Sequence, residues 1–83
     1  MDELAARILI AEHLAVAREM VVDDAEFRRL GADSLDLVTL TMRFEQEFDV
    51  DIPAEQVEGC WTVRDALNLL KTSLASRSLL SVE

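Results

Sequence analysis

The sequence predicts a single small domain built only from helices. Its 83 residues contain two glycines, one proline and no tyrosine, whereas small all-β domains depend on glycine and proline in turns and on aromatic residues in strands. A chain of this length usually forms one hydrophobic core, and 51% of its residues are hydrophobic. We therefore expect one all-α domain that is too small to enclose a deep catalytic cavity.

The first helix is expected from Asp2 to about Arg18. A strand over residues 8–10 is the alternative, but that apolar run is short and lacks the alternation of a half-buried strand. The apolar residues of the segment instead recur mostly in steps of three and four, which is the period of an amphipathic helix. They are Leu4, Ile8, Ala11, Leu14 and Ala15.

A long connection separates this helix from the next one. The helical period fails between Glu19 and Asp33, and connections of this length in compact domains are often functional. Asp33 then provides an N-cap acceptor, and Asp36 follows three residues later, as in a capping box. The second helix should therefore begin at this point and end near Phe48. A few side chains should anchor the connection, which contains Val21, Val22, Asp23, Asp24, Phe27, Leu30 and Gly31.

Two further helices follow. The only proline, Pro53, suits the first position of a short helical turn that ends near Val57. Gly59 and Cys60 interrupt the chain, and Thr62 can cap a last helix. The serine-rich end, residues 76–83, is expected to fray. The apolar stripe of the last helix consists of Val63, Ala66, Leu67, Leu70 and Leu74.

Charge excludes one class of partner and suggests another. Eight basic and 17 acidic residues give a formal net charge of −9, which repels the phosphates of nucleic acids. Residues 31–58 hold eight acidic residues, and Arg43 is the only basic one among them. An acidic surface on the second helix and its flanking loops would orient a basic protein partner. A solvated helix face without a partner explains the same charges equally well.

The second helix has two apolar stripes, whereas a single buried face needs only one. The first stripe is expected in the core, and the second, rotated toward the acidic residues, is a candidate for exposure. The alternative is that a small four-helix domain buries both stripes, which is the commoner case for scattered apolar residues. The first stripe consists of Leu37, Leu40, Phe44 and Phe48, and the second of Leu35, Val38 and Met42.

Ser34 lies in the most informative local motif, Gly31-Ala32-Asp33-Ser34-Leu35-Asp36. The motif puts a hydroxyl at the start of a helix, after a glycine and between two carboxylates. A phosphate on that hydroxyl would lie near the unpaired N–H groups of the first helical turn, which favour anions. From these residues alone, a serine that merely helps to start the helix is the commoner explanation.

The order and spacing of several motifs resemble the acyl carrier proteins. The resemblance extends over the first helix and continues from Phe27 to Leu70. It implies a four-helix bundle with a short third helix and a long loop between the first two helices. It also implies a carrier domain over residues 1–75, a tail at 76–83, and a 4′-phosphopantetheine arm on Ser34. The resemblance rests on Leu30 to Asp36, Phe44-Glu45-Gln46-Glu47-Phe48, Ile52-Pro53 and Thr62-Val63.

The resemblance also implies how such a chain works. A phosphopantetheinyl transferase uses coenzyme A and Mg²⁺ to attach the arm to Ser34. Acyl groups are then carried as thioesters on the thiol of the arm, in fatty-acid, lipid or polyketide biosynthesis, and the carrier itself catalyses nothing. The bundle can shelter the acyl chain between its helices. The implied partners are acyl-loading, elongating or acyltransferase enzymes with basic docking surfaces, and the carrier is a monomer. The residues implied in docking are Asp33, Leu35, Asp36, Val38, Met42 and Glu45.

Several residues depart from the common fatty-acid carriers. Thr39 and Gln46 stand where acidic residues are frequent, and Arg43 adds a base to the second helix. Arg28 and Arg29 replace acidic residues that often precede the Leu-Gly pair. These departures favour a specialised carrier of the bacterial type II kind with dedicated partners.

Two alternatives stay open. One is an unmodified acidic helical module that binds proteins through its exposed apolar stripe. The other is a peptidyl or aminoacyl carrier, although Ala32-Asp33 before the serine favours an acyl carrier. The mass of the chain after treatment with coenzyme A and a transferase separates a modified carrier from an unmodified module.

Other candidate sites are weaker. His13 has no carboxylate or nucleophile evident as its partner and is expected to face solvent. Cys60, the only cysteine, cannot form an intramolecular disulfide and is expected to be buried. Acidic residues at 45–51 lack the glycine-centred pattern of a calcium loop, because Pro53 and Ala54 follow them. No structural metal is expected.

The sequence carries no pattern for secretion or membrane insertion. It opens with Met1-Asp2-Glu3, where a secretory signal would carry positive charge. No apolar run approaches the roughly 18 residues of a membrane-spanning helix. The expected compartment is the cytoplasm.

Overall fold

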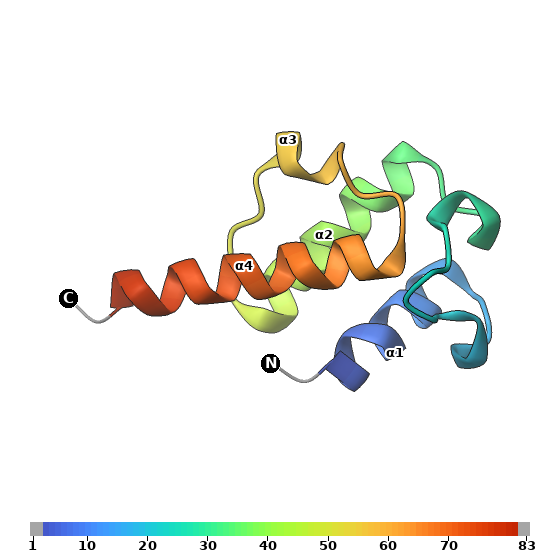
Figure 1. The fold of residues 1–83 in the computed structure, drawn as a ribbon, viewed down its shortest axis with the longest axis horizontal. Coiled ribbons are helices and arrows are strands. Elements are labelled where there is room, and N and C mark those ends of the chain that lie inside the picture. The colour runs from blue at the N-terminus through green and yellow to red at the C-terminus, as the bar shows by residue number, and fades with distance from the viewer. Residues whose placement is uncertain (1–2, 82–83) are drawn as a thin grey trace.

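The computed structural model describes the backbone of residues 3–81 and the side chains of residues 3–53 and 55–75. Within this range the chain contains no strand, only an isolated bridge between Glu26 and Thr62. Four α-helices form the body, and two short 3₁₀ helices lie in the first long connection (Figure 1). The all-α bundle with a short third helix is therefore confirmed. The elements are α1 (Glu3–Leu14), η1 (Arg18–Met20), η2 (Phe27–Leu30), α2 (Ser34–Phe48), α3 (Ala54–Val57) and α4 (Val63–Ser81).

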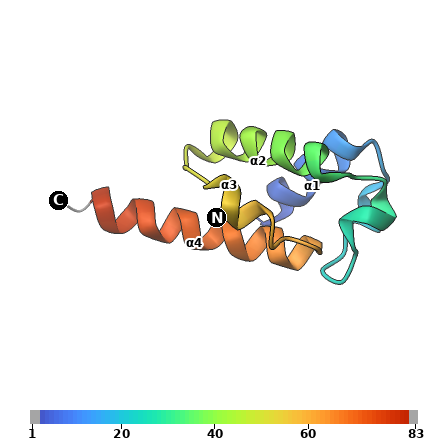
Figure 2. The same ribbon diagram turned by 90° about the horizontal axis from the view of Figure 1, so that it is seen from above.

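The core lies between α1, α2 and α4. Helices α2 and α4 run roughly in the same direction, and α1 runs against them (Figures 1 and 2). Each of these helices, and the first long connection as well, contributes a side chain that is almost wholly shielded from solvent. Removing one such apolar side chain from water stabilises the fold by about 1.5–3 kcal/mol. The largest of these side chains are Ile10, Phe27, Leu40, Phe44, Val63 and Leu70.

Helix α1 is shorter than expected, because it ends at Leu14 and not near Arg18. Ala15 adopts a left-handed φ of 57°. The N–H of Val16 donates to the carbonyl of Ala11 at 3.0 Å, and the N–H of Ala15 donates to that of Glu12 at 3.4 Å. These bonds form a Schellman helix end, in which glycine is the usual left-handed residue. Since alanine occupies that position, no glycine in the sequence marks the stop.

The buried face of α1 also differs from the expected one. Within the predicted stripe only Ala11 is buried, while Leu4 is 63% exposed. Apolar residues occupy several sides of this helix, so their spacing alone does not select the buried face. The expected start at Asp2 lies outside the described residues. The side chains that α1 buries are Ala6, Leu9, Ile10 and Ala11.

The predicted core stripe of α2 faces the interior. Leu40 and Phe44 are buried, whereas Leu37 and Phe48 are half-buried and pack against the edge of the core. The rings of Phe44 and Phe48 lie 6.1 Å apart between centroids, within the range of aromatic pairs. The orientation of α2 predicted from its apolar period is therefore confirmed.

Reciprocal side-chain caps start both α2 and α4. Asp33 accepts from the N–H of Asp36 at 2.9 Å, and Asp36 accepts from the N–H of Asp33 at 3.1 Å. The hydroxyl of Thr62 accepts from the N–H of Asp65 at 3.2 Å, and Asp65 accepts from the N–H of Thr62 at 3.1 Å. Each pair satisfies N–H groups that a helix leaves unpaired. Pro53 differs slightly from expectation, since it is the N-cap of α3 and not its first helical residue.

The first long connection, residues 15–33, is anchored by its own apolar side chains. Val21, Phe27 and Leu30 are buried, whereas Val22 is exposed. Gly31 ends η2 with a left-handed φ of 89°, a conformation in which glycine carries no Cβ penalty. The connection expected to be irregular therefore contains two short helices and a buried segment.

Backbone hydrogen bonds join this connection to the segment before and at the start of α4. Both segments lie at the same end of the bundle in Figure 1. The bonds satisfy backbone groups that neither segment could pair within itself, and they fix η2 next to the connection between α3 and α4. They run from the N–H of Phe27 to the carbonyl of Trp61 at 2.9 Å, from Val63 to Ala25 at 3.0 Å, and from Arg64 to Asp23 at 3.1 Å.

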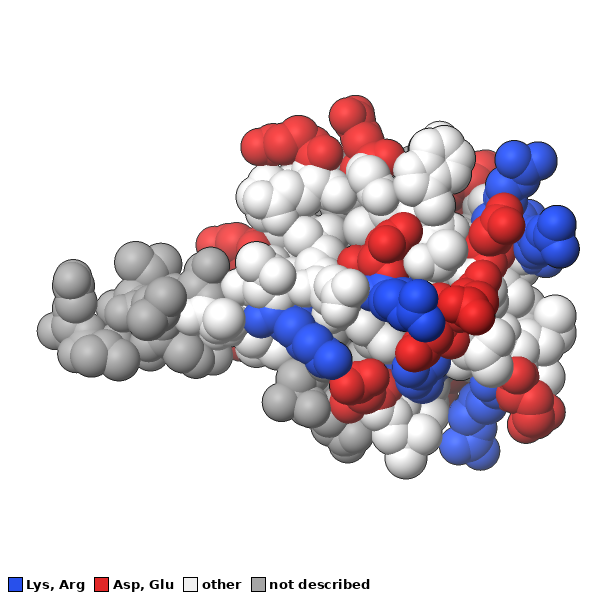
Figure 3. All heavy atoms as spheres, in the orientation of Figure 1, with Lys and Arg blue, Asp and Glu red and all other residues white. Residues whose placement is uncertain are grey.

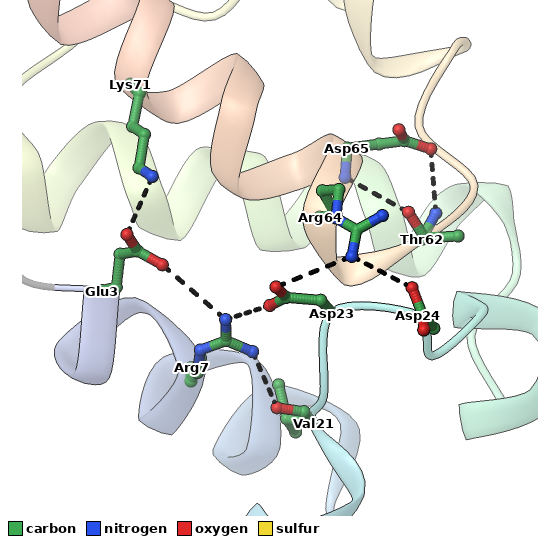
Figure 4. A network of polar contacts seen from close by, with 9 residues as sticks. All are labelled: Glu3, Arg7, Val21, Asp23, Asp24, Thr62, Arg64, Asp65 and Lys71. Carbon is green, nitrogen blue, oxygen red and sulfur yellow. Dashed lines mark hydrogen bonds and ion pairs between the residues drawn. The ribbon is translucent and has the colours of Figure 1, made fainter.

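Charged side chains add a second link between α1, the same connection and α4 (Figure 4). Arg7 forms a hydrogen-bonded ion pair with Asp23, and this bond holds the pKa of Asp23 below its ordinary value. Lys71 donates to Glu3 at 2.8 Å and lowers the pKa of Glu3 in the same way. Exposed ion pairs contribute little individually, so the network mainly orients these elements. Its charged members are Glu3, Arg7, Asp23, Asp24, Arg64 and Lys71.

Helix α4 continues without a break to Ser81. The helix therefore does not mark the expected boundary after residue 75, and residues 82–83 of the expected tail lie outside the described residues. The division into 1–75 and 76–83 stays a prediction. No helix in the described range is both long and apolar enough to cross a membrane.

The left-handed alanine at the end of α1 generates a stability prediction. This conformation costs an L-residue roughly 1–2 kcal/mol, and glycine removes that cost. Glycine also makes the unfolded chain more flexible, which lowers the free energy of unfolding by about 0.4–1 kcal/mol. Ala15→Gly should therefore raise the free energy of unfolding by about 0.5 kcal/mol in urea titrations. The control is Ala17→Gly, because Ala17 has an ordinary φ of −67° and glycine there should be destabilising. A loss of stability in both variants would contradict the expected effect of Ala15.

Candidate functional site

Ser34 is the first residue of α2, and its side chain is exposed. The cap from Asp33 sets this position, because an N-cap residue directly precedes the first helical residue. No hydrogen bond joins the Ser34 hydroxyl to another described residue. The hydroxyl is therefore accessible to a second molecule.

The two acidic residues beside Ser34 have a structural role as well as a charge. Asp33 is exposed and Asp36 is half-buried, and the cap occupies an oxygen of each carboxylate. A substitution at Asp33 or Asp36 therefore changes both the start of α2 and the local charge.

On the face seen in Figure 3, acidic and basic side chains lie side by side over the lower part, whereas acidic side chains line the upper edge over α3.

An exposed apolar stripe begins directly after Ser34. Its members lie three and four residues apart, so they share one face of α2. The expectation that this stripe is not buried in the core is confirmed. Its members are Leu35, Val38 and Met42, which are 69%, 41% and 55% exposed.

A groove of about 490 Å³ opens beside Ser34. η2, the first turns of α2 and the connection between α3 and α4 form its walls. The volume lies within the range of about 300–1,000 Å³ that is typical of small-molecule sites. Charged lining residues are Arg28, Asp33 and Glu58, while Val38, Val57 and Trp61 contribute apolar surface.

A second, much smaller cavity lies among core side chains that include Leu40, Phe44 and Leu69. Its volume is about 10 Å³, which scarcely holds one water molecule. An acyl chain could enter this part of the core only if the side chains or helices around it moved apart.

Glu45 lies on α2 as expected, but its carboxylate is engaged within the chain. Its Oε2 accepts from the N–H of Ile52 at 2.9 Å, and the side chain is half-buried. The bond holds the connection between α2 and α3 in place. Glu45 therefore offers less free charge to a partner than an exposed carboxylate would.

The expectation that His13 faces solvent is wrong. His13 is half-buried, and its Nε2 lies 2.9 Å from the hydroxyl of Thr39. The same hydroxyl donates to the carbonyl of Asp36 at 2.9 Å. His13 therefore contributes to the contact between α1 and α2, and the cause of the error is the misassigned face of α1.

Cys60 is buried, as expected, and it lines the groove beside Ser34. Its Sγ lies 3.8 Å from the carbonyl of Gln56, within reach of a weak S–H hydrogen bond. Burial raises the pKa of the Cys60 thiol, and the negative charge of Asp65 raises it further. The thiol is therefore protonated near neutral pH and is a poor nucleophile.

The described residues contain no cluster of three or more His, Cys, Asp or Glu side chains that could hold a metal ion. The chemistry available at the site is therefore that of one exposed hydroxyl, its neighbouring charges and an apolar groove.

Sequence reasoning missed part of the groove. Arg28 was noted only as a departure from a pattern, and Glu58 and Trp61 had no assigned role. All three line the groove with Ser34, although Trp61 follows Ser34 by 27 positions in the chain. The only feature of the sequence that could have indicated a role for Trp61 was its position directly before Thr62, the cap of α4.

Comparison with known proteins agrees with this site. A family profile described as "Phosphopantetheine attachment site" matches residues 5–70. The acyl carrier protein of Zymomonas mobilis is 47% identical over 73 residues, which cover 84% of this chain and 94% of that protein. The acyl carrier protein of Bradyrhizobium sp. is 46% identical over 79 residues, which cover 92% of this chain and all (100%) of that protein. The crystal structure of an acyl carrier protein from Thermotoga maritima superposes with a TM-score of 0.69 at 28% identity, covering 92% of this chain and 98% of that one.

The environment of Cys60 generates a prediction on thiol reactivity. Because its pKa is raised, alkylation by iodoacetamide at pH 7.5 should be at least about tenfold slower in the folded chain than in denaturant. In denaturant the rate should level off above the pH at which an unfolded thiol ionises, about 8.5, whereas in the folded chain it should still be rising at that pH. The raised pKa favours folding below that pH, and this contribution is lost as the pH rises through the folded pKa. Equal rates in the folded and unfolded chains would contradict the assigned burial.

Proposed function

The chain belongs to the acyl carrier proteins, and we propose on this premise that Ser34 is the residue that bears the family's covalent 4′-phosphopantetheine. The observation that carries the proposal is the exposed Ser34 hydroxyl at the first residue of α2, beside an open groove. The unpaired backbone N–H groups of the first turn of α2 carry a partial positive charge, which favours a phosphate on that hydroxyl.

The chemistry needs only one atom of this chain. The Oγ of Ser34 would form a bond to the β-phosphorus of coenzyme A while the bond from that phosphorus to adenosine 3′,5′-bisphosphate breaks. The hydroxyl proton would leave to a base of the transferase, which also supplies Mg²⁺. When attached, the arm provides a terminal thiol on which acyl groups are carried as thioesters. The raised pKa of Cys60 suits this role, because a neutral thiol does not compete for the acyl group.

Members of this family are carriers and not catalysts. We propose that the chain delivers acyl intermediates of fatty-acid, lipid or polyketide synthesis to acyl-loading, elongating or acyltransferase enzymes, as a cytoplasmic monomer. Its exposed apolar stripe would contact these enzymes, and Asp33 and Asp36 would orient their basic surfaces. Thr39 and Gln46 carry no charge and Arg43 adds a positive one to α2, which supports a specialised set of partners. Glu45 would contribute through its remaining negative charge.

The attachment site is tested by intact mass. Incubation with coenzyme A, Mg²⁺ and a promiscuous phosphopantetheinyl transferase should add one arm of about 340 Da to the wild-type chain. Ser34→Ala should gain nothing, while the control Ser73→Ala on α4 should still gain the arm. An unmodified wild type, or an adduct that persists in Ser34→Ala, would overturn the proposal. The unmodified outcome would favour the acidic protein-binding module instead.

The charge of Asp36 generates a prediction on docking. Asp36→Asn removes the charge but keeps an oxygen that can accept from the N–H of Asp33. At low salt it should slow arm transfer about twofold to tenfold, because an attractive charge steers a basic partner. The control is Asp51→Asn, which removes the same charge beyond the other end of α2, about 20 Å along the helix. Higher salt should narrow the difference, and equal rates for both variants at low salt would refute the docking role. Circular dichroism checks that each variant is folded.

A further inference from the structure

Arg28 is an unpaired cation at the groove beside Ser34. Its side chain is exposed, and it forms neither an ion pair nor a side-chain hydrogen bond with a described residue. Its neighbour Arg29 behaves differently, because its Nε lies 4.0 Å from a carboxylate oxygen of Glu26 and Arg29 does not line the groove. The two arginines of η2 therefore differ in what they face.

The groove brings this cation together with the hydroxyl that is proposed to carry a phosphodiester. Arg28, Asp33, Ser34 and Glu58 all line it, and Arg28 is the only basic residue among the described side chains of its lining. A phosphodiester on Ser34 would add a negative charge next to two carboxylates. Guanidinium groups pair well with phosphate oxygens, because their planar N–H donors match the geometry of two oxygens. Arg28 is the group in the groove that can offset the added charge.

The groove also has an exposed apolar surface in its lining. Trp61 is 65% exposed although it is the largest side chain in the chain. Its backbone is held from both sides, since its carbonyl accepts from the N–H of Phe27 at 2.9 Å and its N–H donates to Asp65 at 3.0 Å. These bonds fix the backbone of Trp61 at the groove, and Val38 adds exposed apolar surface to the same lining.

We propose that Arg28 is a positioning residue that pairs with the phosphodiester on Ser34 and directs the arm into the groove, where it lies against Trp61. The inference rests on the proposed attachment at Ser34. The amide groups and methyl groups of a pantetheine chain match the mixed lining, in which Glu58 offers an acceptor and Trp61 and Val38 offer apolar contact. An arm held in this way is partly covered between visits to partner enzymes.

The chain supplies its own reporter for this arrangement. It contains one tryptophan and no tyrosine, so its intrinsic fluorescence comes essentially from Trp61. When the arm is attached and confirmed by mass, the emission of wild type should shift to shorter wavelength, and acrylamide should quench it less than in the unmodified chain. High salt should reverse part of the change, because it screens the pair between Arg28 and the phosphodiester.

Arg28→Gln is the decisive variant, and Arg29→Gln is its matched control in the same short helix. Loss of the ion pair should lower the ratio of arms that lie in the groove to arms that extend into solvent. The expected decrease is about twofold to fivefold, which corresponds to the free energy of an exposed ion pair. Arg28→Gln should therefore show a smaller fluorescence change with little salt dependence, whereas Arg29→Gln should respond like wild type. Arg28→Lys keeps the charge but not the planar donors, so its response should fall between the two. Circular dichroism and the fluorescence of the unmodified variants check that the fold and the environment of Trp61 are intact.

Each outcome decides a separate statement. If the wild type gains no mass, the proposed attachment fails. If it gains the arm without a change at Trp61, the arm does not lie in the groove and the inference is overturned. If Arg28→Gln responds like wild type, or Arg29→Gln loses as much as Arg28→Gln, then Arg28 has no specific positioning role.

Discussion

The backbone pairing between residues 23–27 and 61–64 is the constraint on which the rest of this structure depends. The two segments are separated in the chain by α2 and α3, and three hydrogen bonds of 2.9–3.1 Å join them. Ordering so long a loop costs chain entropy, and burial of Phe27 and Val63 beside the bonds offsets part of that cost. The pairing gives η2 and the start of α4 fixed positions relative to each other. The open space next to α2 follows from that placement.

The site therefore combines a local and a non-local constraint. The reciprocal cap of Asp33 and Asp36 decides where α2 begins and so leaves the Ser34 hydroxyl exposed. The backbone pairing decides which side chains lie opposite that hydroxyl. The carboxylates that hold this helix start in place also supply the negative charge around the hydroxyl, so the same atoms determine the position of the helix end and the local electrostatics. A carrier of this family needs mainly an accessible hydroxyl on a stably folded domain.

The sequence was most informative where one short segment decides the structure. The capping box of Asp33 and Asp36, the cap at Thr62, the orientation of α2 and the family's serine motif all depend on residues close together in the chain, and these were predicted. The reciprocal role of Asp65 in the cap of α4 was not. The buried face of α1 was not, because Leu4 and Ile10 are equally apolar and only packing against α2 and α4 separates them. The left-handed Ala15 lacked the glycine that marks such a stop. The contact of His13 with Thr39 and the meeting of Arg28 with Trp61 in one groove join distant positions, which spacing along a chain does not encode.

Helix α4 has a consequence beyond the core that it helps to close. Its 19 residues span about 28 Å, and it runs away from the end of the molecule where α2 begins, so that its last described turns project past the other helices (Figures 1 and 2). The two ends of the molecule therefore differ, with the exposed Ser34 hydroxyl at one end and the projecting turns of α4 at the other. A solid support, or a neighbouring protein held by that rod, would leave the hydroxyl facing outward. The same carrier could then serve several enzymes in turn from an anchored position.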